Sequence, residues 1–210
     1  MNYLAHLFLS ANDPADVVGN LAVDFIKGGN PYTHPGILAG MARHRRIDQF
    51  TDSHPSFRAS RSRVSPPHHR YAGVVVDIFY DHFLARNWAT YGGATLDEFS
   101  SWAYRLLDAH TAWLPPRLQR ALPYMAGEHW MGQYATRAGI GRALNGLSRR
   151  SRRDIDLAAT LADLDAHYET LHADFAVFFP ALIADTATQP GSLAGQLPLA
   201  ALSQDRLPQP

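Results

Sequence analysis

The chain has 210 residues, 46% of them hydrophobic, and its 19 Lys and Arg residues balance 19 Asp and Glu residues to a formal net charge of zero. This length and composition predict one globular domain with a sizeable core, and the lack of a basic excess argues against a general nucleic-acid binder. The chain has no cysteine, which excludes disulfide scaffolds, thiolate metal sites and cysteine nucleophiles.

The N-terminal stretch, MNYLAHLFLSANDP, has no basic region ahead of its short apolar run, which His6 interrupts. It therefore does not resemble a signal peptide. No apolar run reaches the length of about 20 residues that a membrane-spanning helix needs. We expect a cytoplasmic protein that binds neither membranes nor nucleic acid.

Apolar residues recur at helical spacing, and no segment alternates as a strand does, so the sequence predicts an all-α fold. Asp13 is placed to cap the second helix, with Pro14 at its first position, and a Gly-Gly-Asn-Pro sequence ends it. His54-Pro55 ends the third helix, and Thr95 caps the fifth. The predicted helices cover residues 3–9, 14–27, 35–54, 71–88, 96–113, 116–134 and 137–149.

The most regular apolar pattern lies towards the C-terminus, where Leu, Tyr and Phe recur in steps of four and three from Leu157 to Leu182. It predicts one long packing helix. From Thr186 the composition turns to Pro, Gly, Gln and Ala. We expect a single helical domain over residues 1–185 and a Pro/Gly/Gln-rich tail over residues 186–210.

Several acids and histidines interrupt helices that are otherwise apolar. His44 and Asp48 are one turn apart and share a helix face, and so do Asp77 and Asp81. Carboxylates in so apolar a helix are rarely buried without a partner or a metal. The remaining residues of this kind are His82, which projects about 100° from Asp81, Asp24 in LAVDFI, and His6 in YLAHLFL.

Each of these residues alone has a structural explanation: a hydrogen-bonded core histidine, a carboxylate that accepts from a neighbouring helix, or an exposed ion pair. Four helices that each place such a residue in an apolar setting favour a shared site instead. His and Asp together suit a divalent ion such as Mn²⁺, Mg²⁺, Fe²⁺ or Zn²⁺. Such an ion can lower the pKa of a water molecule and supply a nucleophile.

Arginines cluster at residues 43–46, 58–63 and 149–153. Solvated helix faces are the usual explanation for such runs. The functional interpretation is phosphate recognition by one or two of them and an acidic partner for the rest. Arg45 is the phosphate candidate because it adjoins His44. A rival metal motif, Glu169-x-x-His172, is half of a di-iron site and has no second copy.

Four blocks in order, NYLAHLFLS, GNLAVDFIKG, HRRIDQFTDSHP and VVVDIFYDHFLARNW, resemble the bacterial acyl carrier protein phosphodiesterases. The resemblance runs from residue 2 to about residue 180. It implies a single-domain helical bundle related to the HD-domain phosphohydrolases. It also implies removal of 4′-phosphopantetheine from holo-acyl carrier protein, with a divalent metal, typically Mn²⁺, and Mg²⁺ or Fe²⁺ as alternatives.

The resemblance also suggests roles for the polar residues. His44, Asp48, Asp81 and His82 would supply most metal ligands, with His6 as a further candidate. Asp24 or Asp77 would bind the metal or orient the attacking water, and Arg45 would stabilise phosphate charge. The His-Asp pair of HD enzymes is reversed here as Asp81-His82, so ligands cannot be copied from those enzymes. Two alternatives stay open: an HD-type hydrolase of a small nucleotide or phosphate ester, and a non-enzymatic helical binding module.

Overall fold

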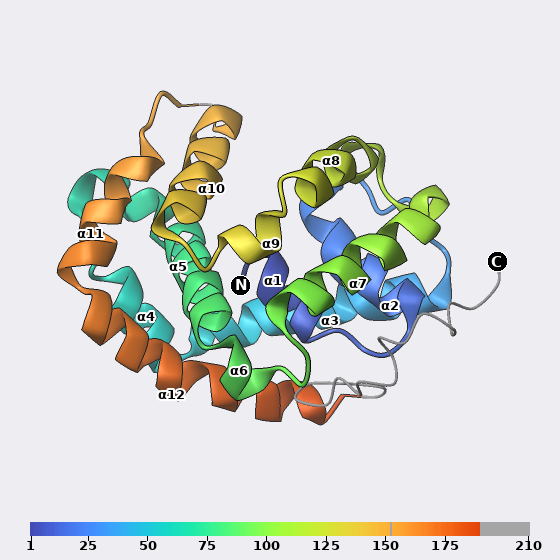
Figure 1. Cartoon of the computed structure of the whole chain (residues 1–210), viewed down its shortest axis with the longest axis horizontal. Helices are drawn as coiled ribbons and strands as arrows, with labels where there is room; N and C mark the ends of the chain where they lie inside the picture. The colour runs from blue at the N-terminus through green and yellow to red at the C-terminus, as the bar shows by residue number, and fades with distance from the viewer. Residues whose placement is uncertain (152, 190–210) are drawn as a thin grey trace.

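A computed structural model describes residues 1–151 and 153–189, and these residues form helices and no strand, which confirms the all-α prediction (Figure 1). Most of the predicted tail lies outside the described residues. The α-helices are α1 (Tyr3–Phe8), α2 (Pro14–Ala22), α3 (Pro35–Ser53), α4 (Pro55–Arg61), α5 (Ala72–Arg86), α6 (Trp88–Tyr91), α7 (Leu96–Ala109), α8 (Pro116–Gly127), α9 (Trp130–Gln133), α10 (Arg137–Arg150), α11 (Leu161–Ala166) and α12 (Tyr168–Ala187). Short 3₁₀ helices are η1 (Val23–Phe25), η2 (Pro66–Tyr71), η3 (Thr111–Trp113) and η4 (Leu157–Thr160).

Helix starts follow the capping residues of the sequence. The Asp13 side chain accepts a hydrogen bond from the backbone N–H of Ala15 at the start of α2. Thr95 and Glu98 form a reciprocal capping box at the start of α7. The chain leaves α3 at His54, whose Nδ1 accepts from the backbone N–H of Ser56 in α4.

The predicted helices 14–27 and 96–113 each end early and are followed by a 3₁₀ helix, η1 and η3 respectively. Two other predicted long helices are broken. The segment 116–134 divides into α8 and α9 because His129 adopts a left-handed conformation, with φ of 52°, and the Met131 N–H donates to the Tyr104 hydroxyl. The predicted helix from Leu157 divides into η4, α11 and α12, with a break at His167. Its apolar residues are still buried on both sides of the break. The prediction of which residues pack in the core is therefore confirmed, whereas the prediction of one continuous helix is wrong.

The core is centred on α5, whose Phe79, Tyr80 and Phe83 are fully buried. Helix α12 runs along the lower edge of the molecule in Figure 1 and packs Phe175 and Phe178 against Tyr80 of α5. The rings of Tyr80 and Phe178 lie 5.2 Å apart. Among the described residues, no helix is long and apolar enough to cross a membrane.

Helices α2 and α3 approach unusually closely because each has a glycine at the crossing. A Cβ on Gly19 would lie 2.1 Å from the Ile37 carbonyl oxygen, and one on Gly40 would lie 2.1 Å from the Asp16 carbonyl oxygen. No side chain fits at such distances. The contact brings His44, one turn after Gly40, against the backbone of α2, where its Nδ1 lies 2.7 Å from the Asn20 carbonyl oxygen.

Candidate metal centre

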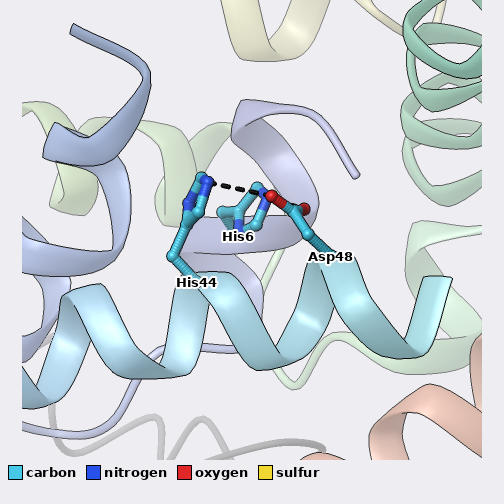
Figure 2. Close-up of side chains that lie close together, drawn as sticks. All are labelled: His6, His44 and Asp48. Carbon is cyan, nitrogen blue, oxygen red and sulfur yellow. Dashed lines mark ion pairs between the residues drawn. The ribbon is translucent and has the colours of Figure 1, made fainter. Parts of the chain in front are cut away.

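His6 of α1 and His44 and Asp48 of α3 come together in one cluster (Figure 2). One ligand atom of each lies within 4.8 Å of the others. The two imidazole rings are stacked, with centroids 4.1 Å apart. The histidines are buried, whereas the Asp48 side chain is 43% exposed. The cluster therefore has a buried floor and a carboxylate that solvent can reach.

Asn20 of α2 fixes the orientation of both histidines. Its amide nitrogen donates to the His6 carbonyl and to Ser10, so its Oδ1 faces His6 Nδ1 at 3.0 Å. Its backbone carbonyl lies 2.7 Å from His44 Nδ1. Because both partners are oxygens that accept, both Nδ1 atoms carry the proton.

The two Nε2 atoms consequently present lone pairs to the same space. His44 Nε2 lies 3.1 Å from Asp48 Oδ2, and His6 Nε2 lies 3.3 Å from Asp48 Oδ1 and 3.1 Å from the Met1 carbonyl oxygen. Lone pairs that face carboxylate and carbonyl oxygens require either a proton or a cation between them. A histidine whose other nitrogen is held by a carbonyl or amide oxygen is the usual arrangement of a metal ligand.

The pKa values of the cluster show which groups attract positive charge. Burial opposes the charged form of His44, but the hydrogen bond to Asp48 and the charge of Asp24 outweigh it and raise its pKa. Burial lowers the pKa of His6. Burial also works against the Asp48 carboxylate, yet its bonds to both histidines hold its pKa well below its usual range. The cluster thus favours an ionised Asp48 carboxylate with positive charge beside it.

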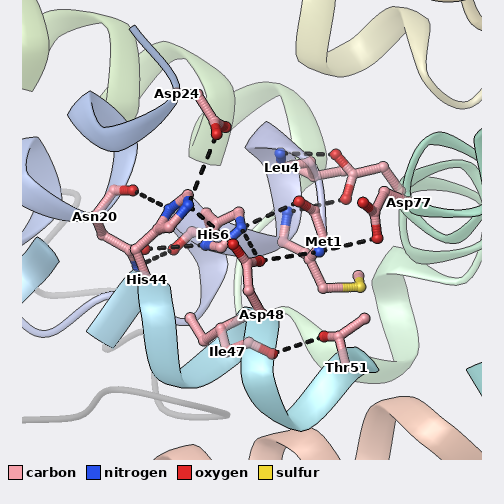
Figure 3. A network of polar contacts seen from close by, with 12 residues as sticks. Met1, Leu4, His6, Asn20, Asp24, His44, Ile47, Asp48, Thr51 and Asp77 are labelled. Atoms are coloured by element: carbon pink, nitrogen blue, oxygen red, sulfur yellow. Dashed lines mark hydrogen bonds and ion pairs between the residues drawn. The ribbon is translucent and has the colours of Figure 1, made fainter. Parts of the chain in front are cut away.

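Two further carboxylates and one ammonium group border the cluster (Figure 3). Asp24 Oδ1 lies 3.7 Å from His44 Nε2, with a side chain that is 37% exposed. The Met1 ammonium lies 3.0 Å from Asp77 and 3.4 Å from Asp48. Burial disfavours this ammonium, but Asp77 and Asp48 raise its pKa to about 10. The position is therefore one where the fold stabilises a cation.

A cavity of about 770 Å³ opens beside the cluster, and the carboxylates of Asp24, Asp48 and Asp77 lie on its wall. Three arginines also line it: Arg117 and Arg120 of α8 and Arg150 of α10. Carboxylates, which can hold a cation, and guanidinium groups, which can pair with phosphate oxygens, thus line one space.

Asp81, predicted as a metal ligand, does not belong to the cluster of His6, His44 and Asp48 and instead contacts the backbone of α1. Its carboxylate is fully buried and accepts hydrogen bonds from the backbone N–H groups of Leu4, at 2.9 Å, and Ala5, at 3.2 Å. It thus satisfies the first turn of α1, where a helix has free N–H groups and favours negative charge. Burial raises the pKa of Asp81 to about 7. These contacts favour a structural role that fixes α1, and hence His6.

His82 faces a different part of the core from the cluster. Its Nδ1 lies 2.8 Å from the Tyr134 carbonyl oxygen and its Nε2 lies 3.1 Å from the Tyr168 hydroxyl. Both ring nitrogens therefore have protein partners. His82 does not belong to the cluster of His6, His44 and Asp48, which is the only group of three possible metal ligands found among the described residues.

Arg45 is exposed and lies outside the cavity lining, on a shallow groove with Arg46 and Gln49. Arg43, by contrast, is buried and pairs with Asp16 at 3.0 Å, so it does not belong to a solvated face. Glu169 and His172 lie on α12, and His172 Nε2 lies 3.0 Å from the side-chain nitrogen of Asn87.

Sequence reasoning missed three residues, Asn20, Arg117 and Arg120. Asn20 is fully buried in an apolar helix, which is the signal that singled out His6 and Asp24, so the same criterion finds it. Arg117 and Arg120 carry no such signal, because an arginine on an amphipathic helix resembles any other solvated residue. Only the packing of α8 brings them to the cavity.

Comparison with known proteins gives one consistent result. Residues 1–182 match the family described as acyl carrier protein phosphodiesterase. Proteins of that name from Serratia proteamaculans and Yersinia enterocolitica are 37% and 34% identical over 186 residues, which cover 87% of this chain and 96% of each relative. The protein of that name from Salmonella agona is 35% identical over 190 residues, covering 89% and 98%. No solved structure matches the chain. The predicted resemblance is confirmed: the chain belongs to the acyl carrier protein phosphodiesterase family.

Proposed function

We propose that the protein hydrolyses the phosphodiester between 4′-phosphopantetheine and a serine of holo-acyl carrier protein, giving apo-carrier and 4′-phosphopantetheine. The observation that carries the proposal is the cavity that Asp48 of the imidazole–carboxylate cluster lines together with three arginines. Phosphoryl chemistry needs positive charge on the non-bridging oxygens and an activated water. The expected setting of this reaction is the cytoplasm.

In this proposal His6 Nε2, His44 Nε2 and Asp48 hold a divalent cation, with Asp24 as a further ligand or water-orienting group. Two imidazoles and carboxylates suit Mn²⁺, Fe²⁺ or Zn²⁺, and Mn²⁺ is the ion that the family resemblance implies. When bound, the ion lowers the pKa of a water molecule and polarises a phosphoryl oxygen. Asn20 holds both histidine tautomers in the ligating form.

The other residues of the cavity bind and orient the substrate. Arg117, Arg120 and Arg150 pair with the phosphate oxygens, a role that we assign to them in place of Arg45 because Arg45 does not line the cavity. Asp24 or Asp77 accepts a hydrogen bond from the attacking water. The water oxygen joins phosphorus as its proton passes to that carboxylate. The bond from phosphorus to the serine oxygen breaks, and the serine oxygen takes up a proton.

The test is to incubate holo-carrier and Mn²⁺ with the protein and to weigh both products. We expect apo-carrier and 4′-phosphopantetheine from the wild type and from Asp108→Asn, a surface control, and none from Asp48→Asn. Intact holo-carrier at high enzyme concentration with several divalent metals would contradict the proposal. Cleavage of nucleotides or small esters alone would favour the alternative hydrolase.

A further inference from the structure

A second cavity of about 570 Å³ lies beside the first, between α9 and α10 and the start of the chain. Four residues, Asn2, Tyr3, Leu147 and Arg150, line both cavities. At this boundary the Arg150 guanidinium donates to the Tyr3 hydroxyl at 3.4 Å. The two cavities therefore adjoin, and the arginine proposed to bind phosphate lies where they meet.

The lining of the second cavity differs in chemistry from that of the first. Its walls include the aromatic rings of Tyr3, Trp130 and Tyr134 and the aliphatic side chains of Ile78 and Leu147. None of the carboxylates of the candidate metal centre borders it, and its one acid, Glu128, accepts from Trp130 Nε1 at 3.0 Å. Three arginines, Arg142, Arg149 and Arg150, also line it. The rest of the wall is mainly aromatic and aliphatic, which suits a flexible organic chain.

Side-chain amides add polar partners to this apolar wall. Asn2, Gln133 and Asn145 all line the cavity. Asn2 donates to the Tyr134 hydroxyl at 2.9 Å, and Gln133 Oε1 accepts from Arg142 at 2.7 Å. Asn145 is exposed. Amide side chains can both donate to and accept from the amides of a ligand, so the cavity suits a chain that contains amide groups.

The connectivity of a phosphodiester decides which ester arm goes where. Once phosphorus lies beside the cluster and Arg150, one ester oxygen leads to the carrier, a folded protein too large to enter either cavity. The other leads to a narrow chain with two amides, methyl groups and a terminal thiol. The cavity volume is within the range of about 300–1,000 Å³ typical of small-molecule sites.

We propose that the second cavity binds the pantetheine arm and that its walls select for the length of that arm. This inference rests on the proposed function for the identity of the substrate. Ala143 and Trp130 are then specificity-determining residues, and Tyr3 with Arg150 marks the point at which the arm joins the phosphate.

The kinetic test is Ala143→Trp, which fills the second cavity from α10, with Ala138→Trp as a control on an exposed position of the same helix. Each is compared on carriers with the complete arm and with an arm cut after its first amide. We expect Ala143→Trp to lower kcat/KM for the complete arm by about 10-fold or more, and to leave the shortened arm and metal content unchanged. Equal rates for Ala143→Trp and wild type on the complete arm, at equal melting temperature, would overturn the inference.

A second measurement does not depend on turnover or on the variant. Wild-type protein with Mn²⁺ is irradiated with a 4′-phosphopantetheine analogue that carries a diazirine in place of the thiol, and the labelled peptides are mapped. We expect labels in residues 128–146, which border the second cavity only. Labels confined to residues 48–52 or 117–121, which border the first cavity only, would overturn the inference. Labels at residues 128–146 in a protein that does not hydrolyse the carrier would support the arm site and contradict the proposed function.

Discussion

Helices α3 and α5 each place an acid and a histidine in an apolar setting, yet the structure uses them differently. His44 and Asp48 of α3 are one turn apart, so they share a face and meet His6 at the edge of a cavity. Asp81 and His82 of α5 are adjacent, so their side chains diverge by about 100° into separate parts of the core. Asp81 accepts from the backbone of α1, and His82 contacts Tyr134 and Tyr168.

The comparison shows which property distinguishes a site from a structural contact. The α5 residues have complete sets of protein partners and no access to solvent at Asp81. In the α3 cluster, lone pairs converge without enough donors to satisfy them, beside an exposed carboxylate. The candidate ion-binding position is therefore indicated by lone pairs that converge without donors, and not by the mere presence of a polar residue in an apolar helix.

The largest expected effect is the loss of a ligand in α3. We expect Asp48→Asn to lower kcat/KM by at least about 10²-fold, because changes to groups that only support metal ligands already cost 10- to 100-fold. Its metal-free melting temperature should also fall, because the depressed pKa of Asp48 means that this carboxylate stabilises the folded state near neutrality. Turnover, bound Mn²⁺ and melting temperature of Asp48→Asn and Asp108→Asn check this, and normal metal content in Asp48→Asn would refute it.

A smaller effect is expected where a residue acts only through the histidines. Asn20→Leu removes the side-chain acceptor of His6 Nδ1 and keeps the backbone carbonyl that orients His44. We expect a loss of about 10- to 100-fold in Mn²⁺ affinity. Calorimetric titration of the variant and the wild type measures it, and unchanged affinity in a folded variant would show that the tautomer of His6 is not set by Asn20.

Asp81→Ala should affect stability first. It leaves the backbone N–H groups of Leu4 and Ala5 without their acceptor, at a cost of about 1–3 kcal/mol. Each kcal/mol lowers the melting temperature by about 2–4 °C in a chain of this size. Thermal unfolding of the metal-free variant provides the measurement. A metal-ligand role predicts the reverse, with unchanged metal-free stability and no bound Mn²⁺.

The pKa of His44 predicts how metal binding depends on pH. It is raised above 6.5, mainly by Asp48 against the effect of burial, so His44 keeps to higher pH than a free imidazole a proton that the ion must displace. Apparent Mn²⁺ affinity should therefore rise with pH, by up to about tenfold per pH unit, and level off above the pKa. Titrations between about pH 5 and 8 test this, and a flat profile would contradict it.

The smallest effect is expected from removing residues 190–210. Their composition predicts little apolar surface that a regular pattern could bury. Deletion should leave the melting temperature and kcat/KM within experimental error of the full chain. A loss of several degrees would show that this segment packs against the helical domain.

The sequence predicted much of the fold because apolar spacing and capping residues report local structure. Asp13 and Thr95 begin helices as expected. The breaks at His129 and His167 were not predicted, because apolar residues on both sides of each break pack into the same core and preserve the pattern. The relation to HD-domain enzymes stays a prediction, since no solved structure matches.

The site was predicted in part for similar reasons. Helix geometry was sufficient to pair His44 with Asp48, but only the tertiary contact between α1 and α3 brings in His6. The same geometry argues against Arg45, which follows His44 directly and so projects about 100° away from it. The partners that satisfy Asp81 come from backbone groups, which no side-chain pattern reveals.

The most direct test of this account is an anomalous difference map from crystals of the protein soaked in Mn²⁺. We predict one strong peak bonded to His6 Nε2, His44 Nε2 and the Asp48 carboxylate, with Asp81 still hydrogen-bonded to the first turn of α1. A peak coordinated by Asp81 and His82, or none at the α3 cluster at saturating Mn²⁺, would contradict the central claim.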